Sequence, residues 1–328
     1  MNTNSQSTIM PKVDKSSYSY AELSDIVPSD KNLLQTAVRQ MRPDSNNYED
    51  SWGYIIQATR NGGFKWYDPQ TASLIFFGRK SATNSTLVIP SFFADPEYLA
   101  YVIRQVENTY QIFHSIVKNV NSSDIGAFTP YGFRPYKKTE CWFAEARFDD
   151  QTYPQMVIDL RKTIEAKGKF FQNLRTTLNK MPPIEIKKYR NTDYKKILEL
   201  FHLKDKASTN RISDVKKMYF TSHAMYPQAR VDKFIVIDKK TKKIIGFIAT
   251  SDITSNNTAL VASIFKPGVR IESVWGIYKT FELKYHEGFK LINLGGNETK
   301  GTFNFMREKF RPVEMLHKTH LIYDPQEL

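Results

Sequence analysis

The stretch that decides the fold is Leu291-Ile-Asn-Leu-Gly-Gly-Asn-Glu298, followed closely by Gly301-Thr-Phe-Asn-Phe-Met-Arg-Glu-Lys-Phe310. Its first four residues form a short apolar run that is typical of a buried strand, and the paired glycines end that run. Apolar residues then recur at helical spacing from 302 to 310. The sequence therefore predicts a strand, a glycine-rich turn and a helix in succession.

Upstream of this stretch, the second half of the chain alternates strand-like and helix-like segments. Their order is β-α-α-β-β-β-α-β-α-β, which favours an α/β fold, an α+β arrangement around a mixed sheet. The expected strands cover 184–190, 234–237, 244–252, 259–265, 291–294 and 315–323, and the expected helices cover 192–201, 214–222, 270–286 and 302–310.

The first half of the chain is also mixed. Asp95 is expected to cap a helix that starts at Pro96 and places Leu99 and Val106 on one face. Another helical spacing begins at Asp30. Strand-like runs are expected at 52–59, 73–78, 86–89, 112–120 and 141–148.

Between the halves, Gln155 to Lys180 has the apolar spacing of one long helix, which Pro182 and Pro183 would end. From 161 to 196 there are eleven Lys or Arg residues against three acidic ones, a local net charge of +8. We expect four parts: a disordered tail at 1–17, a first domain at 18–150, a basic bridging helix at 151–183 and a second domain at 184–328.

Composition restricts the class of protein. The 328 residues carry a net charge of +13, which favours a polyanionic partner such as RNA, a nucleotide or an anionic lipid surface. The single cysteine, Cys141, excludes an internal disulfide, and the six histidines form no metal-binding pattern, so we expect no metal site. No apolar run reaches the ~18 residues of a spanning helix, so we expect a soluble, cytoplasmic protein.

The basic segment Lys167 to Lys180, together with the two segments quoted first, resembles the C-terminal domain of phosphatidylglycerol lysyltransferases and its soluble relatives. It is also similar to Fem-type peptidyltransferases. These families carry a glycine-rich turn before a helix that ends apolar-basic-x-x-aromatic, matched here by Met306-Arg307-Glu308-Lys309-Phe310. The resemblance spans Trp52 to Tyr323 and implies two tandem GNAT-like domains joined by a long basic helix.

The resemblance also implies an activity: transfer of an acyl or aminoacyl group to an amine or hydroxyl of a small-molecule or peptide acceptor. Aminoacyl-tRNA is the expected donor, so tRNA is an expected partner and no cofactor is expected. The pyrophosphate loop of CoA-dependent relatives should lie at 266–275, where Gly268 is the only glycine. Because backbone amides need glycines to approach a pyrophosphate closely, CoA is less favoured. An acyl-CoA-dependent enzyme and a non-catalytic RNA-binding protein stay as alternatives.

Three residues are candidate catalytic groups. Asn297 and Glu298 follow the paired glycines, where Glu298 can bind an ammonium group or take its proton. Arg307 matches the basic position of the family and is the candidate for contacting an oxyanion or a phosphate. In the alternative interpretation, Asn297 caps the turn, Glu298 favours the next helix's N-terminus and Arg307 is a solvated surface side chain.

Further residues are candidates for binding. Trp275 and Tyr278 share a helical face, and Trp52 and Tyr54 share a side of an expected strand, so either pair can line a pocket or simply belong to the core. Lys309 lies about 200° round the helix from Arg307, so at most one of them faces a cleft.

The candidate tRNA contacts are the basic residues of the bridging segment, because phosphates bind Lys and Arg with little sequence demand. A solvated helix face is the alternative. These residues are Lys167, Lys169, Arg175 and Lys180.

Overall fold

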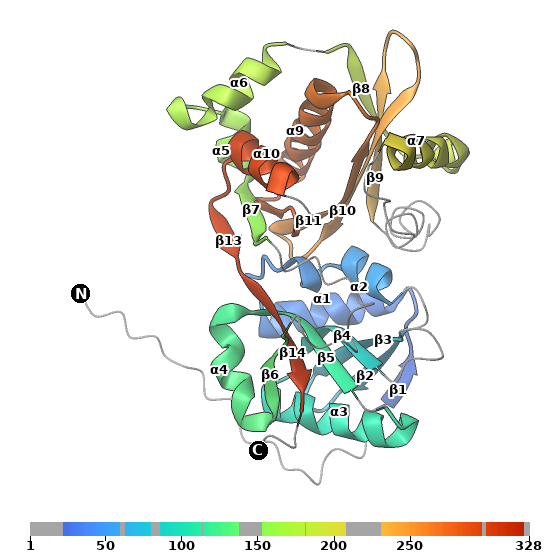
Figure 1. Cartoon of the computed structure of the whole chain (residues 1–328), viewed down its shortest axis with the longest axis vertical. Coiled ribbons are helices and arrows are strands. Elements are labelled where there is room, and N and C mark those ends of the chain that lie inside the picture. The colour runs from blue at the N-terminus through green and yellow to red at the C-terminus, as the bar shows by residue number, and fades with distance from the viewer. Residues whose placement is uncertain are drawn as a thin grey trace, which may run out of the picture.

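The computed structural model describes residues 22–59, 63–79, 86–112, 114–137, 153–180, 182–207, 231–296 and 300–324. These residues form two seven-stranded mixed sheets with helices on both faces of each (Figure 1). Helices α1 and α2 lie between the two sheets, so the halves of the chain share an interface. The α/β class expected from the sequence is confirmed.

The first half supplies most of one sheet and its helices. Its elements are β1 (Glu22–Asp25), α1 (Asp30–Met41), η2 (Tyr48–Asp50), α2 (Trp52–Ala58), β2 (Gly63–Asp68), β3 (Ser73–Arg79), β4 (Thr86–Phe93), α3 (Pro96–Tyr110), β5 (His114–Asn121), η3 (Ser122–Asp124), α4 (Ile125–Phe128), η4 (Thr129–Tyr131) and β6 (Phe133–Pro135). The expected cap is confirmed, since the Asp95 side chain accepts a hydrogen bond from the Tyr98 N–H at 2.8 Å.

The second half supplies most of the other sheet. Strand β7 (Gln155–Asp159) is the last element of the first half. The elements of the second half are α5 (Leu160–Glu165), η7 (Lys169–Phe171), α6 (Gln172–Leu178), β8 (Ile184–Lys188), η8 (Asn191–Asp193), α7 (Tyr194–Ala207), β9 (Asp232–Asp238), β10 (Ile244–Asp252), β11 (Asn257–Phe265), α9 (Arg270–His286), β12 (Leu291–Asn293), α10 (Lys300–Phe310), β13 (Glu314–Leu316) and β14 (Lys318–Tyr323).

The two sheets have the same strand order, and each contains a strand from the other half. One sheet runs β1-β2-β3-β4-β5-β14-β6, and the other runs β8-β9-β10-β11-β12-β7-β13. Each sheet contains five consecutive strands of one half, then one strand of the other half, and then one more strand of the half that supplied the first five. The halves therefore exchange β7 and β14, and the sheets do not follow the boundaries expected at 150 and 184.

The expected long helix at 155–180 is wrong. Residues 155–159 form strand β7, in which Met156, Val157 and Ile158 are all fully buried, as an interior strand requires and a one-sided helical stripe does not provide. The helix that follows ends at Ala166 and Gly168, which have positive φ angles of 47° and 78°. Two short helices, α5 and α6, take the place of one long basic helix.

Two further expectations are corrected. Residues 52–58 form helix α2 instead of a strand, because Ser51 caps it by accepting from the Tyr54 N–H and its aromatic residues are buried between the sheets. The expected closing strand at 315–323 is two strands, because the chain crosses at His317 from the second sheet to the first. The tail at 1–17, the strand at 141–148 and the helix at 214–222 lie outside the described residues.

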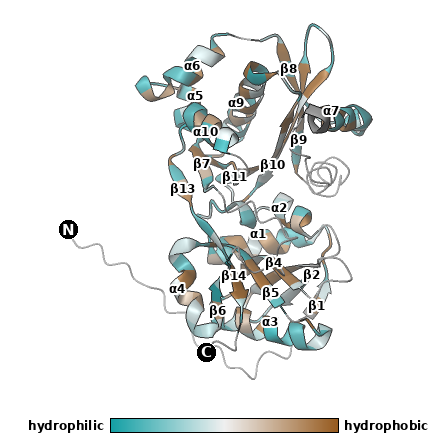
Figure 2. Cartoon of the chain, viewed as in Figure 1, coloured by the Kyte–Doolittle hydropathy of each residue, from teal (hydrophilic) through white to brown (hydrophobic). Residues whose placement is uncertain are grey.

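The core follows from the alternation of side chains along the central strands. In β3, Leu74 and Phe76 face α1 and α2, whereas Ile75 and Phe77 face α3. The cluster around α1 and α2 continues into the second sheet through Phe247 of β10. Figure 2 shows the apolar residues concentrated in the strands, while α6 carries mostly hydrophilic residues.

Gly53 of α2 sets how closely the two halves approach. Its N–H donates to Ser251 Oγ at 3.0 Å, and a Cβ added at Gly53 would lie 3.0 Å from Ser251 Cβ and from Val261 Cγ1. These atoms belong to β10 and β11, so they cannot withdraw without moving a strand. A glycine is therefore required for α2 to lie against the second sheet.

We expect Gly53→Ala to lower the free energy of unfolding by about 1–3 kcal/mol, because the added methyl group overpacks the interface. Gly126→Ala in α4 is the matched control, since no neighbouring atom lies within 4 Å of its added Cβ. That variant should keep the stability of the parent or slightly exceed it. Urea unfolding measures both, and equal stabilities of the two variants would contradict the close-approach argument.

Candidate functional site

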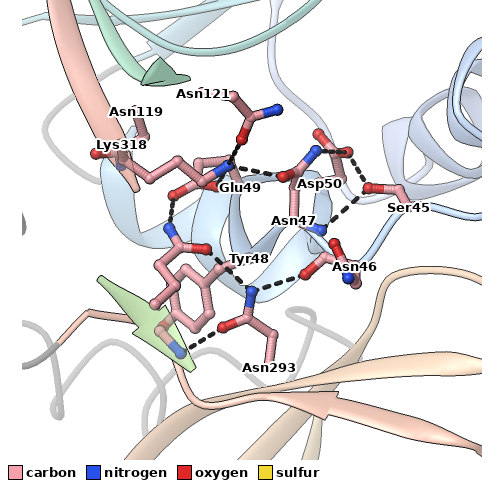
Figure 3. A network of polar contacts seen from close by, with 12 residues as sticks. Ser45, Asn46, Asn47, Tyr48, Glu49, Asp50, Asn119, Asn121, Asn293 and Lys318 are labelled. Atoms are coloured by element: carbon pink, nitrogen blue, oxygen red, sulfur yellow. Dashed lines mark hydrogen bonds and ion pairs between the residues drawn. The ribbon is translucent and has the colours of Figure 1, made fainter. Parts of the chain in front are cut away.

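A short polar segment, Ser45 to Asp50, crosses between the two halves of the molecule (Figure 3). Asn257 Nδ2 donates to the Ser45 carbonyl at 2.8 Å, and Asn293 Nδ2 donates to the Asn46 carbonyl at 2.7 Å. Both asparagines belong to the second sheet. Their amides thus fix the backbone of a segment that belongs to the first half.

Glu49 lies at the centre of this network. Gln155 Nε2 of β7 donates to Glu49 Oε1, and Lys318 Nζ of β14 lies 3.4 Å from Glu49 Oε2. Lys318 also donates to Asn47 Oδ1 at 2.7 Å and to Asn121 Oδ1 at 2.8 Å, and both charged side chains are almost fully buried. The two exchanged strands therefore meet at one carboxylate. None of these residues is predicted as a site residue from the sequence, and the one local signal is the polar residue Asn293 inside an apolar strand.

We expect Lys318→Met to destabilise the protein by about 3–5 kcal/mol, because it leaves the Glu49 carboxylate buried without its cation. Adding Glu49→Gln removes that charge but keeps an oxygen for Gln155, so the double variant should recover at least half of the loss. A double-mutant cycle from urea unfolding measures this. Additive losses would show that the two charges are not coupled.

Tyr48 of the same segment enters the second sheet where β11 and β12 separate. Their parallel pairing ends at Ala259 and Asn293, and the Tyr48 hydroxyl donates to the Val261 carbonyl at 3.2 Å. A Cβ at Gly295, where φ is +68°, would lie 3.1 Å from the Tyr48 ring. The opening between these strands is thus occupied by a side chain from the first half.

A basic groove of about 570 Å³ lies beside α6 and the end of α10. Its lining residues are Lys169, Phe170, Gln172, Asn173, Thr176 and Arg311. Arg311 Nε donates to the Phe170 carbonyl at 2.9 Å, while the Phe170 side chain is 75% exposed. The groove joins the basic segment to the helix that carries Arg307.

Lys309 adds to the positive charge beside this groove. Its Nζ donates to Thr177 Oγ1 at 2.8 Å and to the Asn173 carbonyl at 3.2 Å. Burial lowers the pKa of Lys309, and the neighbouring cations Arg270 and Lys180 lower it further. Several cations therefore converge here, as a polyanion-binding surface requires.

No protein-family model matches this sequence, and no curated protein matches it. Solved structures do match. A conserved protein of unknown function from Bacteroides thetaiotaomicron is 14% identical, covers 92% of this chain and 99% of its own, and has a TM-score of 0.70. FemX is 10% identical, covers 93% of this chain and 98% of its own, and has a TM-score of 0.63. The C-terminal domain of a putative lysylphosphatidylglycerol synthetase from Agrobacterium fabrum is 11% identical, with 92% and 94% covered and a TM-score of 0.58. A tandem GNAT protein also matches over 93% of this chain, with a TM-score of 0.53. The chain has the tandem GNAT fold.

In this tandem GNAT chain, the candidate tRNA contacts differ in exposure and in the groups that they contact. Lys169 lines the groove, and Lys180 is exposed at the end of the same segment. Lys167 Nζ lies 3.4 Å from Glu165 Oε2, and the Lys167 side chain is exposed. Arg175 is used locally, because its Nη1 donates to the Ala166 carbonyl and, at 2.7 Å, to the Gly168 carbonyl.

The candidate catalytic residues are placed only in part. Asn297 and Glu298 lie outside the described residues. Arg307 is exposed on α10, with its guanidinium 5.5 Å from the centre of the Phe303 ring. Arg307 and Lys309 make different contacts, as their angular separation predicts.

The aromatic candidates are mostly buried. Trp52 is fully buried between the halves, and Tyr54 accepts at its hydroxyl from Asn119 Nδ2 at 3.1 Å. Tyr278 donates to the Ile164 carbonyl at 3.2 Å and is buried, whereas Trp275 is half-buried and lies 6.1 Å from Tyr278, ring centre to ring centre. Trp52 and Tyr54 do not share a strand face, because they lie on α2.

Metal clusters and membrane-spanning helices are not found in the described ranges. Within them, no three His, Cys, Asp or Glu side chains come together as metal ligands. None of the helices in those ranges is long and apolar enough to span a bilayer.

His320 of the exchanged strand β14 makes the interface sensitive to pH. Its Nδ1 accepts from the Asn119 N–H at 3.1 Å, which fixes a neutral tautomer. Burial, together with Lys118, lowers the pKa of His320 well below its usual 6.5. His320 is therefore harder to protonate in the folded protein than in the unfolded chain.

We expect the stability contributed by neutral His320 to be complete above pH 6.5 and to be lost as the pH falls below that value. The loss is at most about 1.4 kcal/mol per pH unit. His320→Asn keeps an oxygen as acceptor for the Asn119 N–H and removes the titration. Urea midpoints at pH 7 and pH 5 should converge for the two proteins at the lower pH, and a pH-independent difference would contradict this role.

Proposed function

We propose that this protein is an aminoacyltransferase that takes an aminoacyl group from aminoacyl-tRNA and transfers it to an amine or hydroxyl of a small-molecule or peptide acceptor. The observation that carries the proposal is the basic groove beside α6 and α10. It lies on the element that resembles the basic-x-x-aromatic helix of the lysyltransferase and Fem-type families. A cytoplasmic location follows from the proposed donor.

The groove has the chemistry of a single-stranded nucleic-acid site. Lys169, Lys309 and Arg311 supply cations for phosphates, and Phe170 offers an exposed ring on which a base can stack. An acceptor end of tRNA presents both features.

Two observations favour this donor over acyl-CoA. Tyr48 occupies the opening between β11 and β12, and Gly268 is the only glycine of residues 266–275, which lead into α9. In the first half, Pro96 has no N–H to donate at the start of α3, and Asp95 already accepts from the Tyr98 N–H. The start of α3 therefore offers few amides to a pyrophosphate, and the start of α9 lacks a glycine-rich loop before it. Acyl-CoA stays as the second candidate donor.

The chemistry needs no covalent nucleophile, because an aminoacyl ester is already activated. The enzyme must orient donor and acceptor, stabilise the tetrahedral oxyanion and move one proton from the attacking amine or hydroxyl. We assign the oxyanion contact to Arg307 and the acceptor contact to Glu298 and Asn297. Trp275 remains a candidate for lining the acceptor site.

A donor assay tests the proposal. The protein is incubated with total aminoacylated tRNA carrying labelled amino acids and, separately, with acetyl-CoA and longer acyl-CoAs. We expect protein-dependent loss of one aminoacyl ester, abolished by Arg307→Ala without loss of tRNA binding. Consumption of a thioester alone would replace the donor, and RNA binding that is indifferent to the amino acid, without transfer, would indicate a non-catalytic protein.

The groove itself is tested by charge reversal. We expect Lys169→Glu with Lys180→Glu to weaken tRNA binding at least tenfold and to reduce the slope of log K against log salt by roughly one for each phosphate that the variant no longer neutralises. Arg39→Glu with Lys137→Glu changes the net charge equally but lies in the first half, on exposed residues. Filter binding over a salt series measures both. Equal weakening by the two double variants would show that only net charge matters.

A further inference from the structure

The connection between β9 and β10, residues 238–243, is a strongly basic turn. Residues 239–243 read Lys-Lys-Thr-Lys-Lys, and all five are exposed. None of these four lysines forms an ion pair with an acidic side chain of the described ranges. Four like charges within five residues repel one another, so this turn presents a concentrated positive charge to the solvent.

The basic turn is closed without the lysine side chains. The Asp238 carboxylate accepts from the Lys240 N–H at 2.9 Å and from Thr241 Oγ1 at 2.8 Å. The Asp238 N–H donates to the Lys243 carbonyl at 3.0 Å, and the Lys242 N–H donates to the Asp238 carbonyl at 2.8 Å. These contacts use backbone groups, one carboxylate and one hydroxyl, as Asx turns do. The folding of the turn therefore does not account for its lysines.

Lys242 stands at a backbone position that favours glycine or asparagine. Its φ angle is 59°, in the left-handed region that residues with a side chain rarely adopt. A lysine here gives the turn a charge at a conformational cost that glycine would avoid. Strain of this kind is typical of positions that serve a function outside the local fold.

The base of the basic turn lies beside the segment that leaves the basic groove. The Lys239 N–H donates to the Pro183 carbonyl at 2.7 Å. Lys180 precedes Pro183 by three residues, so their Cα atoms are at most about 11 Å apart. Lys180 is in turn close enough to Lys309 to lower its pKa. Cations thus continue from the groove to the turn, and Figure 1 shows α6 and the β9–β10 connection at the end of the second half that lies away from the first half.

The composition of the basic turn favours a nucleic-acid backbone over a membrane surface. Residues 238–243 contain no apolar side chain, so they offer no group that inserts into a bilayer, and charge alone gives weak membrane attachment. Phosphates of a nucleic acid bind lysine without apolar contacts and with little sequence demand. The turn also has no aromatic ring for stacking, unlike the groove with Phe170, so it suits the outside of a double helix.

We propose that the basic turn binds the phosphate backbone of double-helical RNA, while the single-stranded end of the same RNA enters the basic groove. The placement of the single-stranded end rests on the proposed function. The contact between the turn and a helix does not depend on it. In this arrangement the turn contributes affinity for any RNA helix, and the groove selects an RNA that also has a free single-stranded end.

Two RNA probes separate the turn from the groove: a short blunt duplex, and the same duplex extended by a single-stranded 3′ end. The turn variant is Lys239→Glu with Lys242→Glu, and the groove variant is Lys169→Glu. We expect the turn variant to bind both probes about fivefold more weakly or worse, with a shallower slope of log K against log salt. The groove variant should lose affinity mainly for the extended duplex. Filter binding over a salt series measures all of these.

The control is Arg39→Glu with Lys137→Glu, which changes the net charge as much as the turn variant does but on exposed residues of the first half. The turn variant should keep the melting temperature of the parent, because the side chains of Lys239 and Lys242 make none of the contacts that close the turn. Unchanged binding of the blunt duplex, or weakening no greater than that of the control, would overturn the proposal.

Two further outcomes distinguish this proposal from the proposed function. If the turn variant loses binding to phosphatidylglycerol vesicles but keeps its RNA affinity, the surface is a membrane contact and the proposal is overturned, while the donor assay still decides the proposed function. If the turn variant loses duplex binding and no aminoacyl ester is consumed by the parent, the RNA contact is supported and the proposed function fails.

Discussion

Glu49 is the contact on which the two halves of the molecule depend, because a single buried carboxylate holds both exchanged strands. Gln155 reaches it from the start of β7, and Lys318 reaches it from the start of β14. A buried charge is tolerated only while its partners stay in place, so each strand stabilises the position of the other. The same segment carries Tyr48 into the second sheet. The halves therefore share one interface instead of lying independently on a linker.

This arrangement divides the surface of the molecule into two kinds of opening. The basic groove lies on the second half, between a short basic helix and the helix that carries Arg307. A smaller cavity, of about 260 Å³, lies in the first half, and its three cationic side chains balance three carboxylates. The groove therefore carries an excess of positive charge, whereas the smaller cavity does not. The polar segment around Glu49 lines the small cavity and contacts the second sheet, so it connects the two halves physically.

The sequence predicts correctly those elements that show a long apolar periodicity or a local capping residue. Helix α9 begins and ends where the periodicity of 270–286 places it, and Asp95 caps α3 as its residue type predicts. Local patterns fail where distant packing decides. Residues 155–159 are expected to begin the helix of 155–180, yet they are buried on both faces in a sheet whose neighbouring strands lie more than a hundred residues away in the chain. Helix α2 is rich in aromatic residues because it lies between two sheets.

Only part of the candidate site could be predicted from the sequence. The basic segment is visible in the charge count, and Lys169 does line a groove, but nothing local indicates that Arg175 is used by backbone carbonyls. The network around Glu49 combines single polar residues from segments far apart in the chain. No spacing relates them, so only the folded structure brings them together.

The exchange of strands has a consequence for how the chain folds during synthesis. Strand β14 lies between β5 and β6, yet Asn121 of β5 and its contact Lys318 are 197 residues apart in the chain. The first sheet thus leaves the ribosome with a gap between β5 and β6, and these two unpaired edges persist until β14 emerges. Such edges template association with other chains, so a nascent form of this protein needs protection while its second half is being made. Completion of the first sheet therefore waits for the second half of the chain.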